Sequence, residues 1–245
     1  MLRRFADKEA LSRAAAELFA EQAQAAVADH GRFVALLAGG DTPRRTYEQL
    51  AREPLHSRIP WGQVHFFWGD ERCLPAGDPE RNESMARAAL LDSVPLHPEQ
   101  VHPIRCDQSP ERAAAAYAAE LQAFFGTNPP CFDLVLLGMG SDGHTASLLP
   151  GSASLAEQVR WTVVTRRPDE SFTRVTLTAP LLNQAALVVF LVTGRNKAGV
   201  LRSVLEASSP QPVVPAQLIR PLNGELHWFV DREAASLLDE ADAGS

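Results

Sequence analysis

A glycine-rich segment in the middle of the chain brings one histidine to the end of an apolar run. Residues Leu134 to Leu137 form a run too short for a helix of its own, and such a run is typical of a buried strand. Gly138, Gly140 and Gly143 follow and allow backbone N–H groups to approach a bound anion or ester closely. His144 then lies at the open end of the strand, where ligands bind in parallel α/β sheets. The pattern predicts a chemical role for His144.

Two other interpretations of this stretch compete with a chemical role. The three glycines also spell G-x-G-x-x-G, but the dinucleotide fingerprint should open a long helix and have an acidic residue about 20 positions on. Pro150 and Gly151 stop any helix soon after the turn, and the next strand-like run ends in Arg166 and Arg167. A dinucleotide site is therefore not expected. An isolated histidine can simply begin a helix, yet the position of His144 beyond a buried strand favours chemistry.

A second glycine pair precedes a helix that starts with proline. Gly39 and Gly40, followed by Thr42 and Pro43, form a nest of free N–H groups at the positive end of a helix, which suits a phosphate group. The loop lacks the Lys-Ser/Thr pair of a P-loop, so a nucleoside triphosphate is not expected. The same residues also fit an ordinary turn in which Asp41 or Thr42 caps the helix.

Charged side chains follow three strands at the same predicted edge. Arg72 comes after an aromatic strand and can bind a phosphate with two N–H groups, while Asp70 can accept hydrogen bonds from hydroxyls. Asp142 stands beside His144. Lys197 lies in the first turn of a helix, which is an unfavourable place for a cation unless an anion binds there.

These groups predict proton-transfer chemistry on a small phosphorylated molecule. Gly39, Gly40, Arg72 and Lys197 describe a phosphate pocket, and His144 supplies a base that can activate water to hydrolyse a reactive ester. The sequence contains no H-E-x-x-H, no D-x-D-x-D-G and no G-x-S-x-G motif. We therefore expect neither a metal nor a cofactor.

Composition excludes several classes of protein. The 245 residues carry 23 basic and 30 acidic side chains, and this net charge of −7 argues against general nucleic-acid binding. The longest apolar run, from Ala185 to Val192, is far shorter than the ~20 residues of a membrane span. Acidic residues near the start argue against a leader peptide. Cys73, Cys106 and Cys131 contain no C-x-x-C pair and are expected to be reduced thiols in a cytoplasmic protein.

The spacing of apolar residues predicts alternating helices and strands from end to end. Strands separated by helices imply a three-layer, doubly wound, mostly parallel sheet with helices on both faces, Rossmann-like but without a dinucleotide site. We expect residues 1–245 to form a single domain. Helices are predicted over 7–29, 43–50, 82–91, 110–125, 196–205 and 232–238, strands over 33–37, 64–68, 134–137, 160–164 and 187–192, edge strands over 217–219 and 226–230, a surface loop over 208–212 and a frayed tail after 239.

At these residues the chain resembles the 6-phosphogluconolactonase family, which opens 6-phosphoglucono-δ-lactone to 6-phosphogluconate in the oxidative pentose phosphate pathway. The segment from Leu137 to Gly151 is the most specific match. The other matching stretches span most of the chain in the family's order and cover residues 38–43, 68–72 with Asn82, 174–183 and 194–198.

The resemblance implies a role for each matching residue. His144 is the general base with Asp70 near it, Arg72 and Lys197 bind the phosphate, and the backbone from Gly140 through Asp142 to Gly143 lines the substrate pocket together with Gly39, Gly40 and Thr42. Arg174 and Asn183 match motif positions without a firm role. Asp41 and Arg81 stand where the family commonly has serine. Since a carboxylate is unfavourable beside a phosphate, we expect Asp41 to turn outward or cap the helix.

Two rival functions share parts of this pattern. A glucosamine-6-phosphate deaminase or related isomerase would have the same sheet and bind phosphate in the same way, but the residues from Thr145 to Gly151 are closer to the lactonase pattern. A non-catalytic sugar-phosphate sensor would need the pocket but no base. We expect a small phosphorylated sugar lactone as the ligand, no nucleic-acid or membrane partner, and a monomer or weak homodimer.

Overall fold

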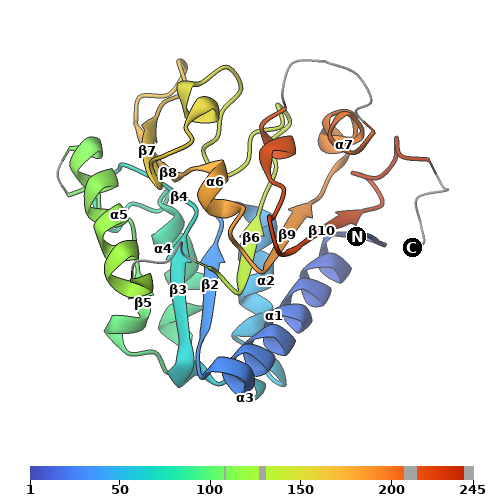
Figure 1. Ribbon diagram of the computed structural model, residues 1–245. Coiled ribbons are helices and arrows are strands. Elements are labelled where there is room, and N and C mark those ends of the chain that lie inside the picture. The colour runs from blue at the N-terminus through green and yellow to red at the C-terminus, as the bar shows by residue number, and fades with distance from the viewer. Residues whose placement is uncertain (108, 127–130, 207–213, 240–245) are drawn as a thin grey trace.

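Seven parallel strands form the centre of the protein (Figure 1). The computed structural model describes residues 1–107, 109–126, 131–206 and 214–239. In spatial order the strands are β1 (Leu2–Phe5), β10 (Glu225–Asp231), β9 (Leu187–Val192), β6 (Leu134–Leu137), β2 (Phe33–Leu37), β3 (Val64–Trp68) and β5 (Val101–His102). The chain runs from β2 outward through β3 to β5, then resumes on the other side of β2 with β6. This reversal is the topological switch point of the sheet, the usual ligand crevice of such folds.

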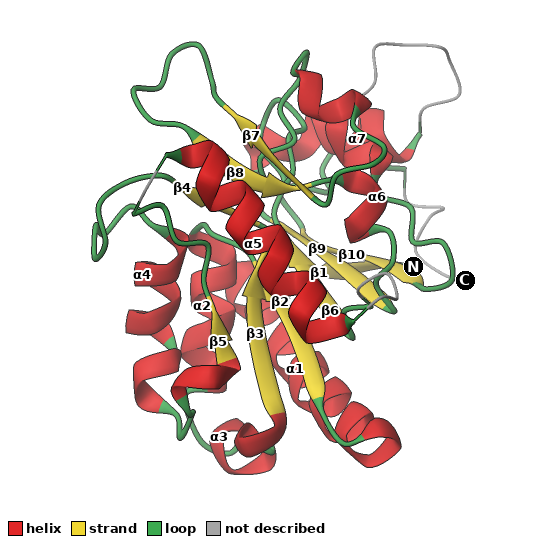
Figure 2. Cartoon of the chain, turned by 60° about the vertical axis from the view of Figure 1, so that its left-hand side comes forward, coloured by secondary structure: helices red, strands yellow, loops and turns green. Residues whose placement is uncertain are grey.

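Helices cover both faces of this sheet (Figure 2). The α-helices are α1 (Lys8–His30), α2 (Asp41–Leu50), α3 (Leu55–Arg58), α4 (Asn82–Ala89), α5 (Pro110–Phe125), α6 (Ala179–Leu182) and α7 (Ala198–Leu205). Adjacent side chains of β3 point to opposite layers: Phe66 stacks on Phe19 of α1 at 6.1 Å, whereas Phe67 packs on Phe124 of α5 at 5.1 Å. The predicted three-layer fold with a mostly parallel sheet is confirmed.

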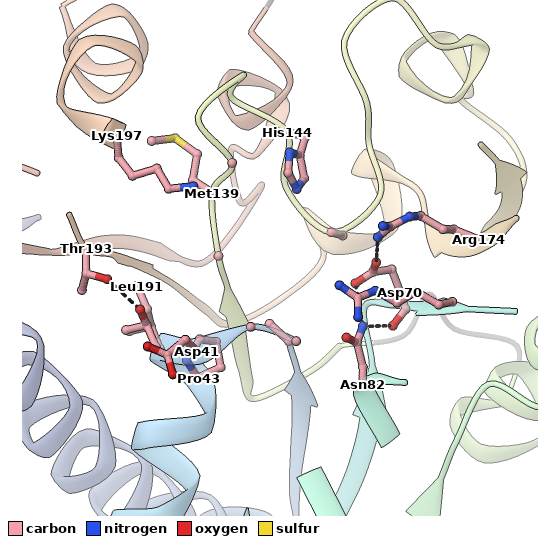
Figure 3. Close-up of a pocket in the computed structure, with 18 of the residues that line it drawn as sticks. Asp41, Pro43, Asp70, Asn82, Met139, His144, Arg174, Leu191, Thr193 and Lys197 are labelled. Atoms are coloured by element: carbon pink, nitrogen blue, oxygen red, sulfur yellow. Dashed lines mark hydrogen bonds and ion pairs between the residues drawn. The ribbon is translucent and has the colours of Figure 1, made fainter. Parts of the chain in front are cut away.

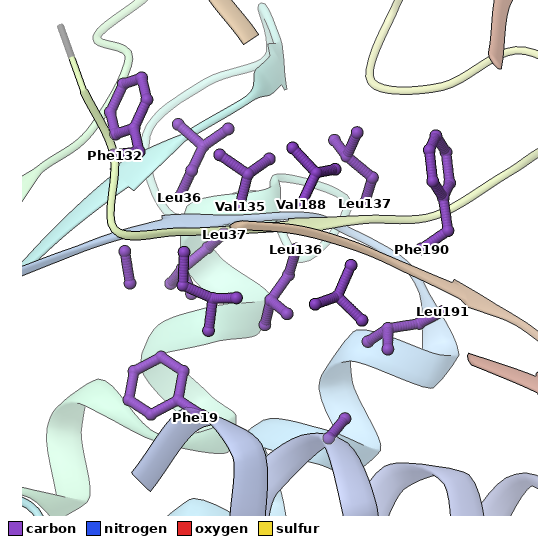
Figure 4. Close-up of a cluster of buried hydrophobic side chains, with 14 of the residues drawn as sticks. Phe19, Leu36, Leu37, Phe132, Val135, Leu136, Leu137, Val188, Phe190 and Leu191 are labelled. Carbon is purple, nitrogen blue, oxygen red and sulfur yellow. The ribbon is translucent and has the colours of Figure 1, made fainter. Parts of the chain in front are cut away.

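The core lies along β6 and β9, whose side chains are buried on both faces (Figure 4). Strands covered on both sides cannot alternate apolar and polar residues, which explains the unbroken apolar runs in the sequence. Phe190 of β9 stacks on Trp228 of β10 with 4.0 Å between ring centroids. These rigid strands end at the loops that carry the candidate chemistry.

A second, smaller sheet was not predicted. It pairs β4 (Asp70–Arg72), β8 (Arg174–Leu177) and β7 (Thr162–Thr165) in antiparallel fashion and packs on α5, where the Thr162 hydroxyl donates to the carbonyl of Ala114 at 2.7 Å. The run predicted over 160–164 belongs to this sheet rather than to the parallel one. Pairing of β4 with β8 puts Arg174 directly opposite Arg72.

Three predictions near the C-terminus are wrong. Residues 217–219 are not an edge strand, because Pro215–Leu218 form a 3₁₀ turn in which the Gln217 side chain accepts a hydrogen bond from the backbone N–H of Val214. The strand over 226–230 exists as β10 but lies inside the sheet, since β1 pairs along its outer side. Residues 232–238 form turns in place of a helix, and the Asp231 carboxylate accepts from the N–H of Ala234. The predicted loop 208–212 and the tail after residue 239 lie outside the described residues.

The remaining short elements are 3₁₀ turns, which connect the strands and helices. They cover Trp61–Gln63, Leu91–Ser93, Pro98–Gln100, Ala153–Ala156 and Arg195–Lys197. Ser109 is the N-cap of α5, because its hydroxyl accepts a hydrogen bond from the N–H of Arg112.

The prediction of three reduced thiols is wrong. Cys73 and Cys106 form a disulfide with 5.1 Å between their Cα atoms, and Cys131 is free. Cys73 follows β4 directly and Cys106 follows β5, so the fold brings together two cysteines that the sequence separates by 33 positions.

Two buried tyrosines hold the strand ends that carry site loops. The Tyr47 hydroxyl donates to the carbonyl of Ala38 at 2.9 Å and accepts from its N–H at 3.0 Å. The Tyr117 hydroxyl makes the same pair of bonds with Trp68, at 3.1 and 2.8 Å. Each phenol thus satisfies both backbone groups where a strand ends and a loop begins.

We predict that Tyr117→Phe lowers the free energy of unfolding by about 1–3 kcal/mol, because the buried N–H of Trp68 loses its partner. Urea unfolding followed by circular dichroism measures the change. An unaltered midpoint would show that water replaces the phenol without cost.

Candidate active site

A cavity of about 320 Å³ opens at the switch point of the parallel sheet (Figure 3). Its volume is within the range of small-molecule sites, about 300–1,000 Å³. All four predicted loops contribute to its wall. The lining residues are Lys8, Ala38, Gly39, Gly40, Asp41, Thr42, Pro43, Asp70, Arg72, Asn82, Gly138, Met139, Gly140, His144, Ala146, Arg174, Leu191, Thr193 and Lys197.

The glycine turn after β6 shapes a histidine–aspartate pair. His144 Nδ1 lies 2.6 Å from Asp142 Oδ1, which also accepts a bond from the His144 backbone N–H at 3.1 Å. A Cβ atom at Gly140 would lie 2.0 Å from His144 Nδ1, so only glycine lets the imidazole fold back against the turn. The backbone N–H of Gly140 donates to the carbonyl of His144 at 2.9 Å and closes the loop.

The surroundings keep His144 in its neutral form. Burial lowers the pKa of His144 below its ordinary value, and this effect outweighs the contact with Asp142, which raises that pKa. The hydrogen bonds from His144 hold the pKa of Asp142 well below its usual range despite its partial burial. An imidazole next to an ionised carboxylate, and neutral near pH 7, is the state that a general base requires.

Asp70 is buried in the pocket wall across from Lys197, and its carboxylate has several polar partners. Its carboxylate accepts from the Ser147 hydroxyl at 2.5 Å and from Asn82 Nδ2 at 3.3 Å, and it lies 3.8 Å from Arg174 Nη1. Asn82 also donates to the Asp70 carbonyl at 2.8 Å. Figure 3 shows this network to one side of His144.

Asn82 is the first residue of α4, and its side chain turns to Asp70 and does not cap the helix. A Cβ on Gly39 would lie 1.9 Å from Asn82 Oδ1, so the glycine leaves room for this amide. Buried Glu71 takes over the capping and accepts from the N–H groups of Asn82 and Glu83, both at 2.8 Å. Burial raises the pKa of Glu71 to about 7, and Arg81 Nε lies 3.8 Å from its carboxylate.

Two cations line the pocket from different loops. Lys197 ends the 3₁₀ turn before α7, and burial lowers the pKa of its ammonium group. It forms no ion pair with the residues that the structure describes. Arg72 donates through Nη1 to the carbonyl of Glu80. In Figure 3, Lys197 and Asp70 lie on opposite sides of His144.

A side-chain hydrogen bond connects the segment after β2 to the loop after β9. The hydroxyls of Thr42 and Thr193 are 2.8 Å apart, and Gly40 precedes the first residue of α2. Asp41 turns outward as expected, to Lys8 Nζ and Arg44 Nη2, each at 2.6 Å. The bond from Lys8 is the largest of the effects that lower the pKa of Asp41 to about 2. Asp41 makes no side-chain cap, and its charge is balanced by the two cations at the pocket rim.

The structure changes the expectation for two residues of the glycine turn. Asp142 does not line the cavity but holds His144 from behind. Gly143 also lies away from the cavity, because a Cβ there would meet Val214 at 2.2 Å and Val200 at 3.0 Å. The pocket-facing part of this loop therefore consists of residues 138–140 and His144.

Sequence reasoning missed Arg167 and gave no role to Arg174. Arg167 lies against the His144–Asp142 pair, with Nη1 at 2.9 Å from Asp142 Oδ2. Arg174 lines the pocket and binds Glu170 through two hydrogen bonds of 2.9 and 2.7 Å. Only the unpredicted small sheet brings these residues near the site. Asn183 lies outside the cavity and fixes the chain near Arg220 and Leu218 through its amide.

Comparison with known proteins places this arrangement in a family. The sequence pattern of the family described as Glucosamine-6-phosphate isomerases/6-phosphogluconolactonase matches residues 6–228. The chain belongs to this family. The resemblance inferred from the glycine turn and the other motifs is confirmed.

Relatives within the family agree over nearly the whole length. The 6-phosphogluconolactonase of Nostoc sp. is 39% identical over 236 residues, which are 95% of each chain. The structure of the Trypanosoma brucei 6-phosphogluconolactonase has a TM-score of 0.86 and 31% identity, and the match covers 98% of each chain. A monomeric glucosamine-6-phosphate deaminase has a TM-score of 0.82 at 21% identity, with 96% and 99% covered, and shares the fold.

Proposed function

We propose that this protein hydrolyses 6-phospho-D-glucono-1,5-lactone to 6-phospho-D-gluconate, with His144 as the general base. The enzyme class, a hydrolase of a sugar-phosphate lactone, follows from family relatives of 35–41% identity that are 6-phosphogluconolactonases. The observation that carries the mechanism is the Asp142–His144 pair in the glycine turn. His144 lines a pocket that Lys197 also lines, and Asp142 supports the ring from behind.

The imidazole can move protons in both halves of the reaction. Asp142 accepts a hydrogen bond from Nδ1–H, so Nε2 is free to take a proton from water as the oxygen adds to the lactone carbonyl. The tetrahedral intermediate then collapses, the bond from C1 to the ring oxygen breaks, and the Nε2 proton passes to that oxygen. The products are a carboxylic acid and a hydroxyl, and His144 returns to its neutral form.

The phosphate would sit away from the reacting carbon. Lys197 and Arg72 supply positive charge, and the Gly39–Gly40 turn supplies N–H groups at the start of α2. Binding of this remote phosphate group holds the lactone carbonyl near His144. Less entropy then has to be lost in the chemical step, because it was already lost on binding. Asp70 and its partners Ser147 and Arg174 form the wall on the other side, where the sugar hydroxyls would lie.

We predict that exhaustive chelation leaves the activity unchanged, because the proposed mechanism uses only protein side chains. Among the described residues, no group of three or more His, Cys, Asp or Glu side chains is placed to hold a metal ion. The measurement compares kcat before and after dialysis against EDTA. Activity that disappears and returns on adding a divalent cation would overturn the metal-free mechanism.

Direct turnover assays separate this function from the deaminase. The shared fold does not discriminate between them, since the monomeric deaminase has nearly the same chain trace. We expect acid release from freshly generated 6-phosphogluconolactone above the spontaneous rate, and no ammonia from glucosamine 6-phosphate. Ammonia release without acid release would reverse the assignment.

The setting of the protein is also a proposal. We propose a cytoplasmic enzyme of one domain over residues 1–245, a monomer or weak homodimer without a nucleic-acid partner. Within the described part of the chain, no helix has the length and apolar character needed to cross a membrane.

A further inference from the structure

Arg167 reaches the candidate base from a loop that the sequence motifs did not mark. It lies between β7 and β8, and its guanidinium contacts both members of the histidine–aspartate pair. Nη1 is 2.9 Å from Asp142 Oδ2, and Nη2 is 2.7 Å from His144 Nδ1. Its side chain is 25% exposed and is not part of the pocket wall. Arg167 therefore acts on the base from behind, without touching a bound substrate.

His144 Nδ1 has two neighbours but can carry only one proton. The ionised Asp142 carboxylate only accepts hydrogen bonds, and the Arg167 guanidinium only donates. Because Asp142 Oδ1 is the closer partner at 2.6 Å and also fixes the His144 backbone N–H, the Nδ1 proton belongs in the bond to Asp142. The Arg167 charge then lies beside a ring nitrogen that already bears a proton. This arrangement opposes a second proton on the ring.

The charges around the ring have opposing effects. Asp142 and Asp70 raise the pKa of His144, whereas burial and the charge of Arg167 lower it. Lys197, at the end of the turn before α7, is a further cation near enough for the charge of Asp142 to raise its pKa. An aspartate alone would stabilise the imidazolium form, which cannot take a proton from water. Arg167 offsets that effect while its second N–H group keeps the carboxylate in place.

Arg167 is itself held by a chain of ion pairs. Its Nε lies 3.7 Å from Glu170 Oε1, and Glu170 is fixed by two hydrogen bonds from Arg174. Arg174 in turn lies 3.8 Å from Asp70. The loop between β7 and β8 thus connects the two acidic residues of the site, and the guanidinium has little freedom to leave the pair.

We propose that Arg167 is a positioning residue for His144: it holds the Asp142 carboxylate against the ring and keeps the ring in its neutral, singly protonated form at neutral pH. The inference rests on the proposed function, in which His144 is the base. It assigns to the β7–β8 loop a role in catalysis that does not involve contact with the substrate.

The test compares Arg167→Gln with wild type and with Arg166→Gln. Arg166 is a neighbouring exposed arginine whose side chain, within the described part of the chain, donates only to the Glu170 carbonyl. We expect the acidic limb of kcat/KM against pH to move up by about one pH unit, which is a tenfold change in protonation. Activity should fall about tenfold below the limb and recover above it. In Arg167→Lys, which keeps the charge, the midpoint of the acidic limb should return most of the way to its wild-type pH. The profile of Arg166→Gln should be the same as that of wild type.

Proton NMR titration of the His144 ring gives the same midpoint without turnover, and the His144→Ala spectrum identifies the resonance. An upward shift in Arg167→Gln supports the inference. A uniform loss of activity with an unmoved midpoint in both Arg167 variants would overturn it. If wild type failed to hydrolyse the lactone, the proposed function would fall, and the NMR titration would still decide whether Arg167 sets the protonation of His144.

Discussion

His144→Ala is expected to lose about 10²–10⁴-fold in kcat, the usual contribution of a general base. The variant should fold normally, because the ring packs against a glycine turn and not within the apolar core. It should also bind 6-phosphogluconate with unchanged affinity, since the residues proposed to bind the phosphate lie on other segments of the pocket wall. The measurement is acid release corrected for spontaneous hydrolysis, with product affinity from calorimetry.

His97→Ala is the matched control, because His97 is an exposed histidine outside the pocket. Its kcat should equal that of wild type. A His144→Ala enzyme with wild-type kcat would remove His144 from the chemistry. The same variant also tests the sensor alternative, because a sensor without catalysis would show no turnover in wild type and would keep its ligand response.

Lys197→Met is expected to lower kcat/KM for the phosphorylated lactone by about 10²–10³-fold, the range for removing one partner of a desolvated charge pair. Lys197 is half-buried and feels the charge of Asp142, but among the described residues it forms no ion pair, so its ammonium group is available to the phosphate. Hydrolysis of unphosphorylated gluconolactone should change little. Arg72→Ala should show the same selectivity, because Arg72, the last residue of β4, lines the same cavity.

Arg195→Met is the control for charge, since Arg195 is an exposed cation in the same 3₁₀ turn and lies outside the cavity. It should leave both substrates unaffected. Equal losses of kcat/KM on the phosphorylated and unphosphorylated lactones in Lys197→Met would mean that Lys197 serves the chemistry or the fold. The phosphate would then have to bind elsewhere.

The sequence predicted the parallel sheet and the pocket because their signals are local. Each buried strand is a short apolar run, and the loop that carries Gly39 or His144 follows such a run directly. The position of those loops at the carboxyl ends of β2, β3, β6 and β9 then brings them to one edge. Glycine spacing identified the turn at Gly140, where a side chain would collide with the histidine.

The parts that were missed depend on contacts between distant segments. The small sheet pairs Asp70 with Thr176. Its strand β4 consists of three charged residues, and β8 begins with Arg174, so neither is an unbroken apolar run. No local pattern therefore predicted that Arg174 lies near Asp70 or that Arg167 lies beside His144. The inner position of β10 was missed for a related reason, since β1 at the start of the chain adds to the outside of the sheet.

The pH dependence of lactone hydrolysis by wild type and His144→Gln, measured side by side from pH 5 to 8, tests the central claim most directly. Burial lowers the pKa of His144, so the neutral base is present at pH 7 and is lost as the pH falls through that lowered pKa. With His144 as the base, the wild-type profile has one acidic limb, and the variant has a rate close to spontaneous hydrolysis with no such limb. A variant that kept both the rate and the limb would show that another group removes the proton from water.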